Sequence, residues 1–117
     1  MLSRINHAFI KTICSVLNID TKISRSTDYT QVGGKTARLI SICRNAGADE
    51  YFSGPAAASY LDRQEFSEAG ISLNFADYSG YPEYRQLHGP FVHEVSILDL
   101  IFNTGPQATT FMKPLRR

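Results

Sequence analysis

The sequence predicts an α/β fold, a Rossmann-like parallel sheet with helices on both faces. Segments with a helical apolar period alternate with short strand-like runs, which is the order typical of a parallel sheet. A length of 117 residues with 43% hydrophobic residues fits one domain over 1–117 with a single core. The expected strands are few and short and would leave sheet edges open. We therefore expect the domain to be incomplete.

The first half of the chain should hold two helices and two strands. Apolar residues that recur every three or four positions predict a helix over about residues 3–18. Thr21–Ser24 is a short strand candidate, followed by a polar loop. A second helix is expected over Lys35–Ala46, because Gly47 stands where a glycine ends a helix. Glu50–Ser53 is the next predicted strand.

The middle of the chain predicts two short helices and a strand. Pro55 begins a helix at the position where proline is tolerated. Asp62 and Glu65 have the spacing of a capping box, and they open a helix that ends at Gly70. Ile71–Ala76 alternates with a period of two, which indicates a third strand.

A loop rich in tyrosine, glycine and proline covers 77–94. An apolar helix follows and ends at Gly105–Pro106, and a last short helical segment comes after it. The polar residues of the apolar helix, Ser96, Asp99 and Asn103, share one face, and its other faces should be buried in a core. Ser96 and Asp99 have the spacing of a helix cap. The other interpretation is a polar stripe that meets a ligand, another part of the fold or an absent segment.

Composition excludes several classes of protein. The net charge is +1 with both signs interspersed, which argues against a nucleic-acid partner, and the pair Arg116–Arg117 is expected to be a solvated tail. No apolar run approaches the roughly 18–20 residues of a membrane span. Cys14 and Cys43 lack metal-site or CxxC spacing and suit a reducing cytoplasm, although a disulfide between them stays open. We expect no metal and no cofactor.

Six motifs in order carry a family resemblance. Over about residues 20–112 they are similar to the C-terminal half of the WbqC-like protein family. They are STD at Ser26–Asp28, GKTARLISICRNAGADEYFSGPAA at Gly34–Ala57, YLD at Tyr60–Asp62, F-x-x-AGI at Phe66–Ile71, DYSGYPEYRQLHGPF from Asp77, and VSILDLIFNTGP from Val95.

The resemblance implies a bacterial, cytoplasmic protein of O-antigen and related surface-polysaccharide biosynthesis. A transferase that passes glycine, another aminoacyl group or an acyl group to a sugar has been suggested for such proteins. Family members are about twice as long, and their first half opens with a strand and a His-x-Pro-x-Tyr-like turn that this chain lacks. We therefore expect a truncated or split reading frame, whose isolated product lacks any catalytic group of the absent half.

Two candidate binding sites follow from the first half. Lys35 and Arg38 lie one turn apart at a helix start, where they and the backbone amides fit a sugar nucleotide or another anionic small molecule. The alternative is a solvated basic face, which the helix dipole disfavours. Ser53 and Gly54 lie at the carboxyl end of a predicted strand, where ligands of open α/β sheets bind. The alternative is a tight turn from strand to helix, with Ser53 as the helix cap.

The second half supplies the candidate catalytic residues, His88 and Asp99. His88 is the best titrating group for acid–base work, mainly because it lies in the family motif. Gln86 and Asn103 are assigned to substrate binding, and His7 and His93 to structure. Aromatic residues of the same loop either stack on a sugar or pack the loop onto the core. They are Tyr78, Tyr81, Tyr84 and Phe91.

The resulting hypothesis is an acyl or aminoacyl transferase that acts on a sugar. One alternative is a non-catalytic half that pairs with a complementary chain or with itself. The other is a nucleotide- or phosphate-binding domain.

Overall fold

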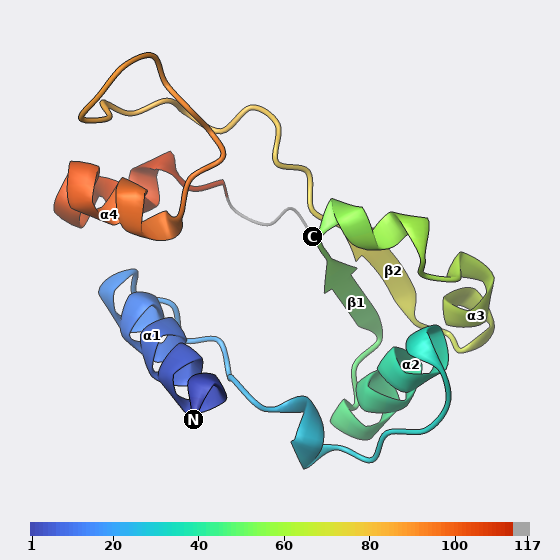
Figure 1. The fold of residues 1–117 in the computed structure, drawn as a ribbon. Helices are drawn as coiled ribbons and strands as arrows, with labels where there is room; N and C mark the ends of the chain where they lie inside the picture. The colour runs from blue at the N-terminus through green and yellow to red at the C-terminus, as the bar shows by residue number, and fades with distance from the viewer. Residues whose placement is uncertain (114–117) are drawn as a thin grey trace. The chain divides into compact units, whose positions relative to one another are not determined.

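The computed structural model describes residues 1–113, so the basic pair Arg116–Arg117 lies outside the described residues. The chain divides into two compact units (Figure 1). One unit is 23–77, and the other joins 1–22 to the segment from residue 78 onward. The prediction of one domain over 1–117 stays a prediction.

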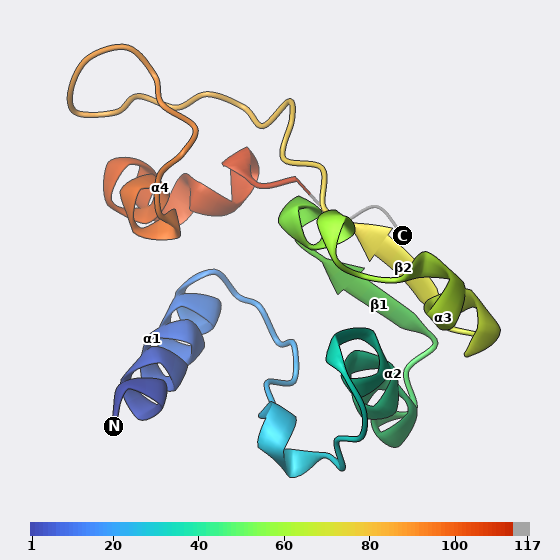
Figure 2. The same ribbon diagram turned by 45° about the vertical axis from the view of Figure 1, so that its right-hand side comes forward.

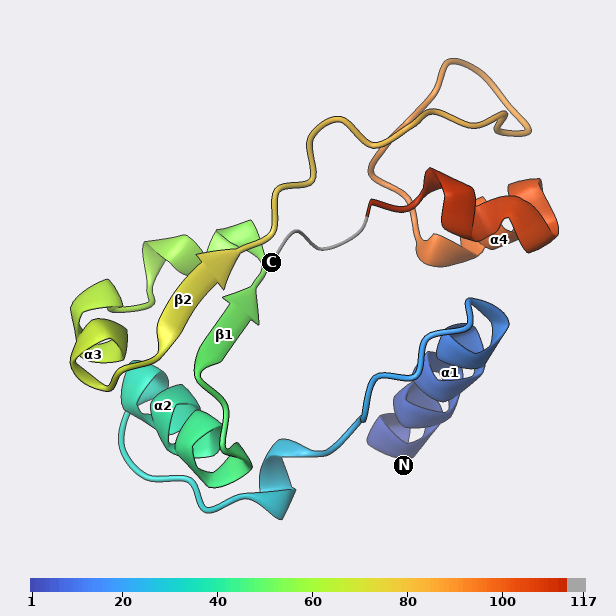
Figure 3. The same ribbon diagram turned by 180° about the vertical axis from the view of Figure 1, so that it is seen from behind.

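The unit 23–77 contains a two-stranded parallel sheet. Strand β1 (Glu50–Ser53) pairs with β2 (Ser72–Phe75), with Tyr51 opposite Leu73, and both strands face the viewer in Figure 3. The α/β class and the parallel pairing are confirmed. The predicted strand Thr21–Ser24 is wrong, because this segment has no neighbouring strand in the part of the chain that the structure describes.

The helices of this unit begin and end where local chemistry favours it. Helix α2 (Lys35–Ala46) ends at Gly47, whose φ of 67° is the left-handed conformation that glycine adopts readily. Helix α3 (Arg63–Glu68) is capped by Asp62, which accepts bonds from the backbone amides of residues 64 and 65. The predicted helix at Pro55 is a short 3-10 helix, Pro55–Ser59.

The core of this unit is centred on Phe66 of α3, which is fully buried. Its ring stacks on Tyr51 of β1 with a centroid distance of 5.5 Å. Figure 2 shows the helices beside the two strands. The exposed residues Glu50, Phe52 and Asn74 occupy the opposite face of the sheet, so the described helices pack on one face of it. The other buried members of the core are Ile40, Cys43, Ala57, Leu61 and Ile71.

The second unit contains helix α1 (Leu2–Val16), helix α4 (Ile97–Thr104) and a 3-10 helix over Gly105–Phe111. Its small core consists of Leu17, Leu100 and Ala108 with half-buried neighbours. The expectation that α4 is buried on all its apolar faces is wrong. Phe102 is 82% exposed, since none of the described residues covers that side of the helix.

Helix α1 has nearly the predicted extent, but most of its apolar face is exposed. It contains no buried residue, and only its last turns reach the small core, through Ile13 and the following Leu17. The rest of its apolar stripe is exposed. None of the described helices is both long enough and apolar enough to cross a membrane. The exposed apolar residues of α1 are Leu2, Ile5, Phe9, Ile10 and Val16.

Candidate functional site

Asp99 is the centre of a hydrogen-bonded cluster on α4. Its Oδ2 accepts from the Tyr84 hydroxyl at 2.6 Å and from Gln86 Nε2 at 3.1 Å. Its Oδ1 accepts from Asn103 Nδ2 at 3.2 Å, and the same amide nitrogen donates to the Asp99 carbonyl at 2.8 Å. We call Tyr84, Gln86, Asp99 and Asn103 the Asp99 cluster. A carboxylate that receives several donors is held in a fixed orientation.

The cluster resolves the two interpretations of the polar stripe. Ser96 does cap α4, because its hydroxyl accepts from the amide of Leu98 at 3.2 Å. Asp99 turns away from the cap and toward the loop that precedes the helix. Capping therefore explains Ser96, whereas a polar network explains Asp99 and Asn103.

Gln86 fixes the loop that carries His88. Its Nε2 donates to the carbonyl of Val92 at 2.8 Å, and its Oε1 accepts from the amide of Val92 at 2.9 Å. Because Nε2 also reaches Asp99, one side chain closes the loop 86–92 and ties it to α4. The clamp satisfies two backbone groups that a surface loop otherwise leaves to water.

An aromatic pocket of about 350 Å³ lies beside this cluster. Tyr84 belongs to both, since its ring lines the pocket while its hydroxyl bonds Asp99. The ring meets Phe91 edge-on at 5.1 Å and Phe111 at 5.8 Å, and Phe91 meets His93 at 4.6 Å. Tyr78 and Tyr81 complete the aromatic part of the lining. Packed aromatic walls with a few fixed polar groups are typical of small-molecule sites.

The cluster changes the acidity of one member. Burial raises the pKa of Tyr84 above its ordinary value of 10.0, and the hydrogen bond to Asp99 raises it further, while the hydrogen bond with Gln86 lowers it. The phenol therefore stays protonated and acts as a donor to Asp99 over a wider pH range than a free tyrosine does.

His88 is exposed in the clamped loop and makes no hydrogen bond or ring contact with the described residues. The structure thus brings Gln86, Asp99 and Asn103 together and leaves His88 outside their cluster. The catalytic roles predicted for His88 and Asp99 stay predictions.

The candidate residues of the unit 23–77 form two pairs, one at the start of α2 and one at the end of β1. Lys35 and Arg38 are exposed on the first turns of α2, and the Lys35 ammonium lies 5.8 Å from the centroid of the Tyr60 ring. Ser53 is the last residue of β1 and Gly54 follows it, and their carbonyls accept hydrogen bonds from the backbone amides of Ala76 and Ala57 at 2.8 and 3.1 Å. No hydrogen bond among the described residues joins the two pairs, and their substrate-binding roles stay predictions.

The two cysteines are not joined to each other. Both cysteines are free thiols, and burial raises the pKa of Cys43. Within residues 1–113, no group of three or more His, Cys, Asp or Glu side chains is placed to hold a metal ion.

Comparison with known proteins identifies the family. The model of the WbqC-like protein family matches residues 1–111. The chain belongs to the WbqC-like protein family. It is also 45% identical, over 116 residues, to the uncharacterized protein Rv1507c of Mycobacterium tuberculosis. That match covers 99% of this chain and 50% of the mycobacterial protein, so the chain spans about half the length of this relative. No solved structure matches the chain.

The family match extends the resemblance that the sequence motifs carried. Those motifs began near residue 20, whereas the WbqC-like model matches from residue 1 and therefore includes α1. The range of about residues 20–112 given for the resemblance was therefore too short at its N-terminal end.

Sequence reasoning missed two residues of the candidate site in this WbqC-like chain. The sequence predicts that Tyr84 stacks on a sugar or packs the loop onto the core. In the structure its hydroxyl also makes the shortest hydrogen bond to the Asp99 carboxylate, at 2.6 Å. The sequence predicts a structural role for His93, yet its ring lines the aromatic pocket and meets Phe91. The many aromatic residues in 78–93 indicated a candidate site in this loop, but the sequence does not show which aromatic rings contact one another.

Proposed function

We propose that the aromatic pocket beside the Asp99 cluster binds a sugar, in a WbqC-like protein that takes part in the biosynthesis of bacterial surface polysaccharide in the cytoplasm. The observation that supports this is the double role of Tyr84, which joins an aromatic wall to a hydrogen-bonded carboxylate. Aromatic faces cover the C–H faces of a sugar ring, and oriented polar groups select its hydroxyls.

The reaction proposed for the whole protein is transfer of an acyl or aminoacyl group to that sugar. His88, held in its clamped loop, is the proposed group for proton transfer. Lys35 and Arg38 are proposed to hold an anionic donor, because they are exposed cations on a helix whose first turn has no acidic residue.

The sugar site is tested by saturation-transfer NMR with a panel of monosaccharides and sugar nucleotides. We expect contacts from the sugar ring to aromatic protons, and an affinity reduced about tenfold by Tyr78→Ala or Tyr81→Ala, since each removes a wall of the pocket. Phe52→Ala is the matched control, because Phe52 is an exposed aromatic residue of β1. Equal losses in all three variants, or no binding by any sugar, would remove the pocket from the proposal.

A second candidate function is a non-catalytic half that pairs with a complementary chain. The exposed apolar face of α1 favours it, and we propose that this chain corresponds to the C-terminal half of longer family members. The test is co-expression with the half of the mycobacterial relative that this chain does not match. A stable, co-purifying complex supports pairing, and separate elution of the two chains opposes it.

A further inference from the structure

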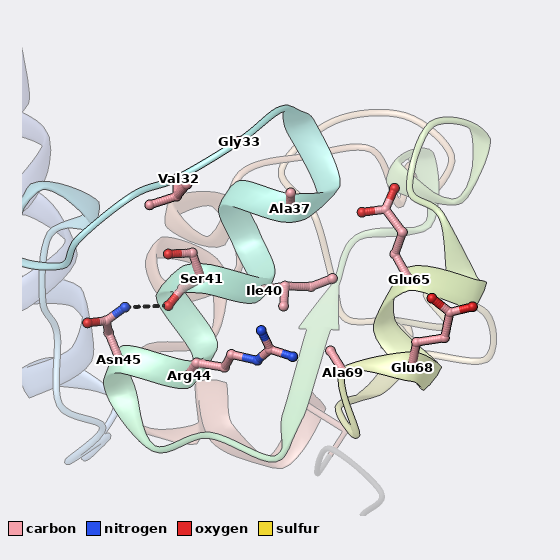
Figure 4. A pocket seen from close by; sticks show the side chains of 10 residues that line it. All are labelled: Val32, Gly33, Ala37, Ile40, Ser41, Arg44, Asn45, Glu65, Glu68 and Ala69. Carbon is pink, nitrogen blue, oxygen red and sulfur yellow. Dashed lines mark hydrogen bonds between the residues drawn. The ribbon is translucent and has the colours of Figure 1, made fainter.

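A groove between α2 and α3 is a cavity to which none of the predicted site residues belongs. It has a volume of about 470 Å³, within the range of roughly 300–1,000 Å³ that small-molecule sites occupy. Figure 4 shows that α2 and the preceding loop form one wall, and that α3 forms the other. The groove shares no lining residue with the aromatic pocket, and it contains neither Lys35 nor Arg38.

The apolar part of the groove is shaped by the loop before α2. Ile40 is buried in its floor, and Val32 and Ala69 contribute apolar surface on opposite sides. The loop is tied to α2 by the Ser41 hydroxyl, which donates to the carbonyl of Thr30 at 2.9 Å. These contacts leave a hydrophobic surface between two polar walls.

Charges of opposite sign face this apolar surface. Arg44 extends from α2 toward α3, while Glu65 and Glu68 lie one turn apart on α3 and share one of its faces (Figure 4). Glu68 is held by Gln64, whose side-chain amide donates to it at 2.8 Å. The Arg44 guanidinium and the Glu65 carboxylate form no hydrogen bond or ion pair with any residue from 1 to 113.

We propose that the groove binds an α-amino acid with an aliphatic side chain. The ligand carboxylate pairs with Arg44, its ammonium pairs with Glu65 and Glu68, and its side chain covers Ile40. A guanidinium donates two parallel hydrogen bonds to a carboxylate, and an ammonium group can donate to two carboxylates at once. A ligand that carries both charges satisfies both walls of the groove, whereas a simple anion or cation leaves one wall without a partner.

The charge requirement is tested on the intact chain by calorimetry and by amide NMR spectra, with leucine as the probe. N-acetylleucine lacks the ammonium and leucinamide lacks the carboxylate. We expect leucine to bind at least about tenfold more tightly than either, with shifts at the amides of α2 and α3. Equal binding of leucine and N-acetylleucine would overturn the proposal, as would no binding of leucine up to about 20 mM.

The assignment of charges is tested by neutral variants. Arg44→Gln should weaken leucine binding about tenfold or more, and so should Glu65→Gln combined with Glu68→Gln. The controls are Arg4→Gln and Glu83→Gln, each of which removes one charge of the same sign from an exposed position of the other unit. Unchanged leucine affinity in the groove variants, with melting curves like that of the parent chain, would overturn the site. Neither result depends on whether a sugar binds the aromatic pocket.

Discussion

At the scale of single residues, Asp99 joins α4 to the loop that precedes it. It is a half-buried carboxylate that accepts three side-chain donors, and two of these come from the preceding loop. A carboxylate in such surroundings stabilises the loop, because each donor would otherwise need water at a partly enclosed site. The cluster therefore links the position of the loop 86–92 to the integrity of α4.

Substitutions in the cluster should be non-additive. We expect Asp99→Ala to lower the free energy of unfolding by about 1–3 kcal/mol, because it leaves donors without a partner. In the Asp99→Ala variant, Asn103→Ala should lower the free energy of unfolding by less than it does in the parent chain. Residues of one network couple by about 0.5–3 kcal/mol. Urea unfolding measures both, with Asp20→Asn as the control at a site outside the cluster. Clean additivity would show that the two side chains act independently.

The Tyr84 phenol gives a pH-dependent prediction. Its pKa in the folded chain is raised above the ordinary value of 10.0, so the folded state holds the proton more tightly than the unfolded state does. Its contribution to stability is therefore fully present below about pH 10 and is lost as the pH rises through the folded-state pKa. Tyr84→Phe should flatten the decline of the unfolding free energy in that range, as followed by denaturation at successive pH values. An equally steep decline in the variant would assign the effect to other groups.

Lys35 and Arg38 predict an anion-dependent stabilisation. Inorganic phosphate or a sugar nucleotide should raise the melting temperature, because a ligand that binds only the folded state stabilises it by mass action. Lys35→Ala with Arg38→Ala should abolish this increase, measured by differential scanning fluorimetry. Arg63→Ala removes a cation that lies over the Phe75 ring and should keep the increase. An increase that persists in the double variant would place the anion elsewhere.

At the scale of elements, the loop before α2 depends on one glycine. Gly33 has a φ of 88°, and a Cβ built there would lie 2.7 Å from the Cβ of Ala37. Gly33→Ala combines a strained backbone with a steric clash, and it should lower the free energy of unfolding by about 1–3 kcal/mol. The neighbouring Gly34→Ala is the matched control, because its φ is −77° and a Cβ at this position would meet no atom within 4 Å beyond its chain neighbours. Chemical denaturation of both variants decides whether the loop needs this glycine.

At the scale of the whole molecule, the exposed face of α1 predicts association. Large apolar side chains on one face of an amphipathic helix favour burial against another surface. We expect the isolated chain to dimerise or aggregate at low micromolar concentration, as measured by sedimentation velocity. Ile5→Glu with Phe9→Glu should shift it toward monomer, whereas Lys11→Glu on the polar face should not. A monomeric parent chain with a cooperative melt would contradict this prediction.

Apolar periodicity and the residues at helix ends predicted most of the helices correctly, but not every strand. Apolar spacing predicted α1, and Gly47 and Asp62 marked the end of α2 and the start of α3, because these are local preferences of the backbone. The prediction of a strand at Thr21–Ser24 was wrong, because a strand needs a neighbouring strand to pair with. The local sequence does not specify such a partner. The prediction that α4 is buried on all its apolar faces was wrong for a related reason. Burial of Phe102 requires another segment to pack against it, and the sequence of α4 does not specify that segment.

The sequence by itself determined the α/β class, the end of α2, the start of α3 and the family, through periodicity, capping residues and motifs in register. It also indicated that Asp99 and Asn103 share a face of α4, because that follows from helix geometry. Only the tertiary structure decided that Tyr84 and Gln86 meet Asp99, and that Arg44 faces Glu65 and Glu68 across a groove. Contacts between segments distant in sequence depend on how the elements pack, and helical or strand periods carry no information about that packing.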